Sequence, residues 1–414
     1  GGAEAEGVAA EGAAAAAAAE QLTSALGLVA KTLQRCGLGL EHVLFVRLYV
    51  SRMAHYAAIN AAYSAAFAGR PPAARAAVEL PLGAGRALCV EVVACGATKQ
   101  LLHVQSISEW APRMIGPYCQ MTAAHGVALV AGNLGLEPAT MRLVGGTAAQ
   151  AAQALANCGA MLRGLQGFEA KRTLQMVLYL TAEADADAAR RAARRWLRGH
   201  GAAGAALLLL QVGGLPMGAL VEVQLEAAAA AAPALAQHSF TVTHGRLRVA
   251  CHLTVSGASS AEAHTDTGCA GGATASSGAE TSAAGDGSLE PSPVAALGTL
   301  QCLVGLAAGA AAGAEVADVP VAQLVDSLRE AQRQAHVLLE SRALRAGRAQ
   351  HVRAFCEVGL LPAAALRGAL LETMAGAPCS VLALPVERIR TSQARLAVQL
   401  HFAVDARRTV ATDD

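Results

Sequence analysis

The sequence is poor in aromatic and charged residues, which limits the kinds of protein it can encode. Only 3% of its 414 residues are aromatic and 15% are charged, whereas 54% are hydrophobic. Alanine supplies most of this apolar surplus, and it favours helices while contributing little to membrane insertion. The 32 basic and 31 acidic residues leave a net charge of +1. The chain therefore lacks the basic surface of a nucleic-acid-binding protein.

Signals for export and membrane insertion are also missing. No signal peptide is visible and the chain begins with Gly1, so we expect a part of a longer protein. Residues 294–314 are the longest uncharged stretch, but Gly and Ala dominate it and no basic cluster or aromatic belt flanks it. We therefore expect no membrane span. The apolar run 202–223 is interrupted by Gly213, Gly214 and Pro216, which predicts a strand, a turn and a second strand.

Motifs for metal or disulfide chemistry are absent as well. The ten cysteines form no C-x-x-C pair, and the twelve histidines form no H-E-x-x-H motif. His238, His244 and His252 are the closest group of histidines. Two of them fall on an expected hairpin, which favours turn and surface roles over metal binding. We expect a cytoplasmic protein whose chain holds no metal and no cofactor.

What the sequence does contain is one pattern repeated three times. The first copy has an alanine-rich helix ending near Gly37, a strand at 43–50, a helix that Pro71-Pro72 ends, and a strand at 87–93. In the second copy we expect helices at 148–165 and 185–197 and strands at 173–180, 207–212 and 219–225. In the third we expect helices at 321–344 and 362–374 and strands at 351–358, 380–384 and 395–404. The predicted domains are residues 1–98, 109–228 and 237–407.

The second and third copies begin with similar hairpins. TAAHGVALVAGNL (122–134) and TVTHGRLRVACHL (241–253) both place His-Gly at the turn, and both have Val-Ala at the same offset beyond it. The first copy lacks this hairpin. In the third copy, Ser/Gly/Ala-rich residues 256–293 follow the hairpin, lack periodicity and are expected to be disordered.

The repeats predict how the copies assemble. Each copy would have helices on one face of a sheet, so its other face must be buried elsewhere. Three such faces can cover one another in a cyclic arrangement, as they do in homotrimers. We therefore predict an intramolecular pseudo-trimer of α+β units with the order β-β-α-β-α-β-β.

The helix expected at 185–197 is rich in arginine. It carries Arg190, Arg191, Arg194 and Arg195. A cluster of this kind can bind an anion, but the spacing favours a single solvated helix face.

Several motifs resemble one family of α+β proteins. WAPRMIGPYCQ (110–120), VAGNLGLEP after it and LPMGALVEV (215–223) resemble the RidA/YjgF family of trimeric enamine/imine deaminases, with a chorismate-mutase-like fold. The first copy resembles the same family through VRLYV, I-N-x-x-Y (Ile59, Asn60, Tyr63) and PPAARAAV. Residues 101–120 resemble the joint between tandem RidA-like domains in the C-terminal half of eukaryotic diphthine–ammonia ligases.

The resemblance implies a role beside a synthetase. In those ligases an N-terminal ATP-pyrophosphatase domain activates the diphthine carboxylate of elongation factor 2 with ATP, and ammonia forms the amide. Its S-G-G-x-D-S signature is not in this sequence, and no Walker A or Rossmann glycine pattern replaces it. The chain would be an accessory half, with the ligase domain, elongation factor 2 and a small carboxylate as partners. The alternatives are a free-standing imine deaminase or a carboxylate sensor.

The resemblance also implies a ligand pocket, in which an arginine clamps the substrate carboxylate, a glutamate orients water and a tyrosine lines the wall. The arginine position is Leu207 in the second copy, and the third copy has neither the arginine nor the glutamate, so a composite pocket remains. Its candidate residues are Arg75, Glu91, Tyr118, Gly132, Asn133 and Glu222.

Arg75 and the two glutamates can also have simpler structural roles. Arg75 can be a relict that makes a surface or interface salt bridge. Glu91 and Glu222 each lie between two valines and can be solvated strand positions, because strand residues alternate between the two faces of a sheet.

Overall fold

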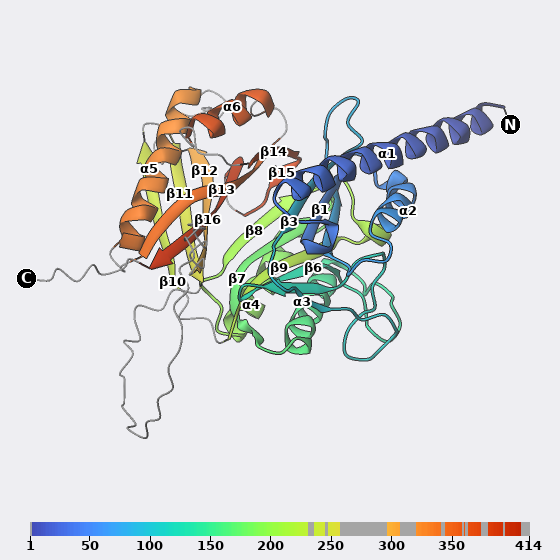
Figure 1. Cartoon of the computed structure of the whole chain (residues 1–414), viewed down its shortest axis with the longest axis horizontal. Coiled ribbons are helices and arrows are strands. Elements are labelled where there is room, and N and C mark those ends of the chain that lie inside the picture. The colour runs from blue at the N-terminus through green and yellow to red at the C-terminus, as the bar shows by residue number, and fades with distance from the viewer. Residues whose placement is uncertain are drawn as a thin grey trace, which may run out of the picture.

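The structure is a computed structural model of the whole chain, with helices packed on three sheets (Figure 1). It describes residues 2–230, 236–244, 247–256, 296–306, 320–340, 344–357, 360, 363–373, 380–391 and 394–406. The expected disordered insertion at 256–293 lies outside the described residues, apart from its first residue.

Unit one has a three-stranded sheet in the order β2-β1-β3, with β1 parallel to β2 and antiparallel to β3. Two helices pack on one face of this sheet (Figure 1). The elements of the unit are α1 (Gly2–Arg35), β1 (Val43–Val50), α2 (Tyr56–Ala66), β2 (Ala74–Glu79) and β3 (Leu88–Ala94).

Unit two repeats this arrangement and adds the hairpin, which gives the sheet order β15-β8-β7-β9-β6-β5-β4. The hairpin turns at His125-Gly126, both with positive φ, as predicted. The strands of the unit are β4 (Gln100–Leu102), β5 (Met121–Ala124), β6 (Val127–Leu134), β7 (Phe168–Leu180), β8 (Ala206–Gln211) and β9 (Val221–Ala229). Its helices are α3 (Thr147–Gly164) and α4 (Ala186–Gly199).

Unit three has the sheet order β10-β11-β12-β16-β13-β14 and contributes β15 to the edge of the sheet of unit two. Its strands are β10 (Ala236–His244), β11 (Leu247–Ser256), β12 (Ala296–Leu306), β13 (Leu344–Glu357), β14 (Ser380–Val386), β15 (Arg388–Ile389) and β16 (Leu396–Ala406). Its helices are α5 (Val321–Glu340) and α6 (Ala363–Thr373).

The repeat order predicted from the sequence is confirmed, with four strands that it does not predict: β2, β4, β12 and β15. Strand β2 follows the Pro71-Pro72 pair, where the sequence predicts no strand. Strand β12 is inserted between β11 and β16, whereas the corresponding β6 and β9 of unit two pair directly. It occupies part of the uncharged stretch 294–314, so these residues build a sheet.

Helix α1 covers the sheet of unit one through one face. Its alanine-rich sequence has high helix propensity, and Gly37 follows its end with φ +70°, as the sequence predicts. Ala18, Leu22 and Leu26 recur every fourth residue and are fully or almost fully buried in the core of unit one. Among the described residues, Glu6–Arg35 is the one helix long and apolar enough to cross a membrane, and 17% of its most apolar window is buried.

The three sheets bury their helix-free faces against one another, which confirms the predicted pseudo-trimer. The shared core contains Tyr49 and Val78 from unit one, Tyr179 and Leu210 from unit two, and Phe355 from unit three. A further core joins unit one to the hairpin of unit two through Phe45, Cys119 and Leu129. The junctions between units therefore lie inside the molecule, where side chains from two units can meet.

Candidate functional site

Arg75 lies on β2 at the junction of units one and two and is 2% exposed. Its guanidinium lies over the rings of Tyr56, Tyr63 and Tyr118, at 5.6, 4.6 and 5.0 Å from their centroids. Arg75 Nη2 donates a hydrogen bond to the Tyr56 hydroxyl at 2.6 Å. Electron-rich ring faces stabilise a buried cation. Within the described part of the chain Arg75 has no salt bridge, so the simpler role considered for it is not observed.

Glu222 reaches the same junction from β9 of unit two and is 2% exposed. Burial raises its pKa from 4.5 to about 8, and the Ala77 backbone hydrogen bond and the charge of Arg75 offset this only in part. The carboxyl therefore exchanges a proton close to neutral pH. This is the property that a general acid or base needs.

Four polar atoms at this junction are buried without a hydrogen-bond partner. They are Arg75 Nη1, Glu222 Oε1, Asn60 Oδ1 and the Tyr63 hydroxyl. A buried polar atom without a partner is costly, and its presence calls for an explanation such as a ligand. Donors and acceptors are both represented, so the group is suited to a ligand that carries a carboxylate and a polar centre. We call Arg75, Tyr56, Tyr63, Tyr118 and Glu222 the Arg75 pocket.

Two glycines allow the close approach of these side chains. A Cβ atom at Gly132 would lie 1.9 Å from Glu222 Oε1, and one at Gly116 would lie 2.8 Å from Arg75 Nη2. Tyr118, Gly132 and Asn133 line a cavity of about 20 Å³, which has room for about one water molecule. The Asn133 side-chain amide is engaged elsewhere, because its Nδ2 donates to the Ala131 carbonyl at 2.7 Å.

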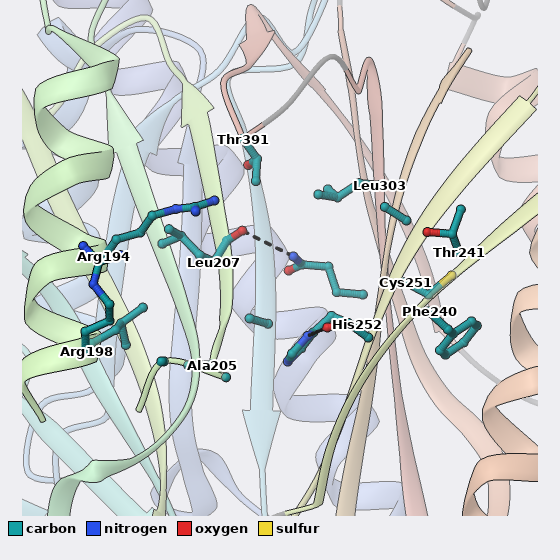
Figure 2. A pocket seen from close by; sticks show the side chains of 17 residues that line it. Arg194, Arg198, Ala205, Leu207, Phe240, Thr241, Cys251, His252, Leu303 and Thr391 are labelled. Atoms are coloured by element: carbon teal, nitrogen blue, oxygen red, sulfur yellow. Dashed lines mark hydrogen bonds between the residues drawn. The ribbon is translucent and has the colours of Figure 1, made fainter. Parts of the chain in front are cut away.

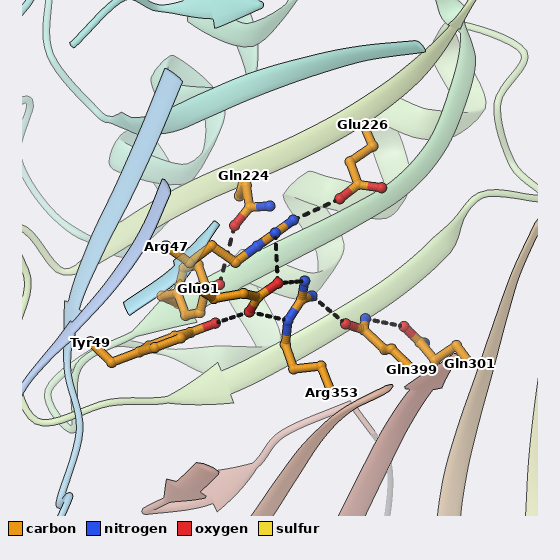
Figure 3. A network of polar contacts seen from close by, with 9 residues as sticks. Arg47, Tyr49, Glu91, Gln224, Glu226, Gln301, Arg353 and Gln399 are labelled. Carbon is orange, nitrogen blue, oxygen red and sulfur yellow. Dashed lines mark hydrogen bonds and ion pairs between the residues drawn. The ribbon is translucent and has the colours of Figure 1, made fainter. Parts of the chain in front are cut away.

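Glu91 does not belong to this site, although the sequence placed it there. It lies where the three sheets meet and accepts hydrogen bonds from Arg47 Nη1 at 3.0 Å and from Arg353 Nε at 2.8 Å (Figure 3). Arg47 also pairs with Glu226 at 2.9 Å, and Arg353 Nη1 donates to Gln399 at 2.7 Å. Burial lowers the pKa of Arg353, but the Glu91 carboxylate, together with Tyr49 and Tyr179, raises it by more in total, so the pKa lies above its usual value. We call these residues the central network.

The strand register explains the difference between the two glutamates. Tyr49 and Tyr179 are the next-to-last residues of β1 and β7, and they face Cys89 and Glu222. Cys89 therefore occupies the position in unit one that Glu222 occupies in unit two. Glu91 lies two residues further along its strand. The prediction that Glu91 joins Arg75 is wrong because V-E-V occurs in both strands at different registers.

The six residues that the sequence predicts for one pocket therefore lie in two different places. Arg75, Tyr118, Gly132, Asn133 and Glu222 gather at the junction of units one and two, and both glutamates are buried rather than solvated. Tyr56 was missed as a site residue, and Asn60 and Tyr63 were seen only as a family motif. The signal available was their position on the helix before the P-P-A-A-R segment.

Metal chemistry has no candidate group here. Among the described residues, no cluster of three or more His, Cys, Asp or Glu side chains can hold a metal ion. Of the three grouped histidines, His252 accepts or donates a hydrogen bond with the Ser239 hydroxyl at 2.9 Å.

Comparison with known proteins places these features in context. The sequence profile of the family described as Endoribonuclease L-PSP matches residues 6–97 and 108–229. A diphthine–ammonia ligase of Schizosaccharomyces pombe is 35% identical over 121 residues. That match covers 29% of this chain and 20% of the ligase, so the chain spans about a fifth of this relative.

Solved structures with similar folds include RidA from the Antarctic bacterium Psychrobacter sp., at 25% identity and a TM-score of 0.27. The match covers 29% of this chain and 95% of that one. The YjgF gene product of E. coli is 24% identical with a TM-score of 0.28, over 29% of this chain and 94% of its own.

Proposed function

The chain belongs to the Endoribonuclease L-PSP family, and we propose that it is the accessory, RidA-like part of a diphthine–ammonia ligase. The observation that carries this proposal is the 35% identity to the fission-yeast ligase. The chain contains no S-G-G-x-D-S nucleotide motif. In this proposal, ATP binding and activation of the diphthine carboxylate of elongation factor 2 belong to an ATP-pyrophosphatase domain outside these residues.

The Arg75 pocket gives this accessory part a ligand of its own. A guanidinium with a free N–H and a carboxyl with a pKa near 8 lie at the same junction and come from two different units. Arginine is suited to a carboxylate because it can donate two parallel hydrogen bonds. We therefore assign the pocket to a small carboxylate. Because the adjoining cavity holds only about 20 Å³, binding of the ligand requires side chains around the pocket to rearrange.

A chimaera tests the ligase assignment. The region of the fission-yeast ligase that matches this chain is replaced by the chain, and the product is expressed in cells that lack the ligase. Mass spectrometry of elongation factor 2 then measures conversion of the carboxylate to the amide. We expect conversion with the chimaera and none with this chain alone. A folded, expressed chimaera that leaves the carboxylate unconverted contradicts the proposal.

The geometry also favours a second candidate, an enamine/imine deaminase. Arg75 would hold the substrate carboxylate and Glu222 would exchange a proton with the attacking water. The test is 2-iminopropionate hydrolysis by the whole chain, by Arg75→Ala and by the matched surface variant Arg142→Ala. Deaminase activity should fall at least about a hundredfold in Arg75→Ala and stay unchanged in Arg142→Ala. Equal activity in all three proteins contradicts this candidate.

A further inference from the structure

A second cavity lies at the junction of units two and three. Its volume is about 490 Å³, within the range of small-molecule sites. One wall is formed by α4 and β8 and includes Arg194, Arg198 and Leu207, and the opposite wall is formed by β10 and β11 (Figure 2). We call it the Arg194 cavity. Unlike the Arg75 pocket, it is large enough for an organic ligand without any movement.

The charged side chains that line this cavity are positive. Arg194 and Arg198 line it, and none of its lining residues is Asp or Glu. Two other arginines of α4 have carboxylate partners: Arg190 pairs with Asp187, and Arg191 lies 4.0 Å from Asp185. Within the described residues no carboxylate pairs with Arg194 or Arg198. The two guanidinium groups at the cavity are therefore available to an anion.

The polar and apolar groups of the cavity indicate the ligand's shape. Arg194 and Arg198 are one helical turn apart, with about 5–6 Å between their Cβ atoms. Leu207 lies on the same wall as the two arginines and Leu303 lies across the cavity from them (Figure 2). The buried Gln301 amide donates to the Leu207 carbonyl at 3.5 Å. Such a surface is suited to two acidic groups on a short apolar body.

The cavity differs chemically from the Arg75 pocket although the two junctions correspond. Arg75 on β2 pairs with Val46 on β1, and Leu207 on β8 pairs with Met176 at the corresponding position of β7. An apolar residue thus replaces the strand arginine, and the cationic groups come from the helix instead. A ligand held by α4 therefore lies nearer the surface than one held by Arg75.

We propose that the Arg194 cavity binds a small organic dianion, whose two acidic groups contact Arg194 and Arg198. This site is separate from the Arg75 pocket and does not depend on the function proposed for it. Because charge-assisted hydrogen bonds from arginine are stronger than neutral ones, we expect the two arginines together to raise the affinity at least about tenfold.

Isothermal titration of the whole chain tests this site, with malonate, succinate and glutarate as probes and dimethyl glutarate as the neutral analogue. We expect at least one dianion to bind at a ratio of one per chain, with binding weakened by added salt, and no binding of the diester. Absence of binding by all three dianions overturns the proposal.

A matched pair of variants locates the binding. Arg194→Ala/Arg198→Ala removes the two cavity arginines, and Arg191→Ala/Arg195→Ala removes the same charge from the same helix outside the cavity. The first pair should weaken binding at least about tenfold and the second less than about twofold. Equal losses in both pairs, or loss of binding in Arg75→Ala with the cavity arginines intact, overturn the assignment. Circular dichroism melting confirms that each variant is folded.

Discussion

Glu222 and Glu91 are buried to a similar extent but are stabilised in different ways. Two arginines surround Glu91, so its negative charge is compensated in the interior. Glu222 has one backbone hydrogen bond and a neighbouring guanidinium, and its Oε1 has no hydrogen-bond partner. Its carboxyl is consequently protonated over a wider pH range. A carboxyl in this state can exchange a proton, whereas the paired Glu91 carboxylate helps to hold the units together.

The raised pKa of Glu222 predicts how stability depends on pH. The folded protein holds this proton up to about pH 8, whereas the unfolded chain releases it near pH 4.5. The folded state therefore binds more protons between these values, and stability falls as pH rises through them. Glu222→Gln should remove this loss, on the order of a few kcal/mol at about 1.4 kcal/mol per pKa unit.

Urea unfolding of both proteins at pH 5 and pH 8.5 measures the effect. We expect Glu222→Gln to be stabilising relative to the parent at pH 8.5 by more than at pH 5. A pH dependence that is the same in parent and variant would mean that the folded-state pKa of Glu222 is not raised.

Gly132 tests the close packing in the Arg75 pocket. A methyl group there would lie within 1.9 Å of Glu222 Oε1, so the carboxylate must move in Gly132→Ala. We expect Gly132→Ala to weaken small-carboxylate binding at least about tenfold, because the carboxyl leaves its place opposite Arg75. The control is Gly145→Ala, where a Cβ meets nothing within 4 Å. Titration of 2-iminopropionate analogues into both variants gives the comparison.

At the scale of single elements, helix α1 shows how an alanine-rich sequence becomes part of a core. Helix propensity explains why the segment is helical, but packing of one face against α2 and β3 fixes where it lies. Leu22 is fully buried and Leu28 is 66% exposed on the same helix. The two leucines therefore form a natural pair for comparing burial.

Leu22→Ala should lower the free energy of unfolding by about 2–5 kcal/mol, because it removes apolar contacts and leaves a cavity. Leu28→Ala should change it by less than about 0.5 kcal/mol. Thermal and urea unfolding of the two variants check this difference. Equal effects would show that α1 does not pack on unit one in solution.

Strand β12 changes which strands of the third sheet are neighbours. It separates β11 from β16, so the third unit cannot place a strand-borne glutamate over the hairpin as β9 does in unit two. Its Cys302 instead faces Cys251, with the sulfur atoms 3.8 Å apart. In the described part of the third unit, the strand that corresponds to β9 therefore does not pair with the hairpin.

At the scale of the whole molecule, the central network joins the three units. Glu91 of unit one contacts Arg353 of unit three, and Arg47 of unit one contacts Glu226 of unit two (Figure 3). Two positive and two negative side chains meet there, so the buried charges balance. Residues this polar are tolerated at a core only when each is paired.

Removing one member of the network should be costly. Arg353→Met leaves Glu91 with a single guanidinium partner in the interior, and we expect a loss of about 3–5 kcal/mol in unfolding free energy. The control is Arg333→Ala, which removes an exposed ion pair with Glu330 and should cost less than about 1 kcal/mol. Urea unfolding measures both. A loss in Arg353→Met no larger than in the control would contradict the buried network.

The sequence by itself determined the repeated order of helices and strands, the hairpin turn at His125-Gly126, and the need to bury three sheet faces. These follow from local periodicity and turn chemistry, which act over a few residues. It also indicated that Arg75 and Tyr118 belong to one pocket.

Only the tertiary structure decided which glutamate accompanies Arg75. Glu91 and Glu222 have the same V-E-V neighbours, and the register of β3 and β9 separates them. Register, the inserted strand β12 and the Arg194 cavity all depend on contacts between residues far apart in the chain. Such contacts follow from how whole sheets pack, and no local sequence pattern predicts them.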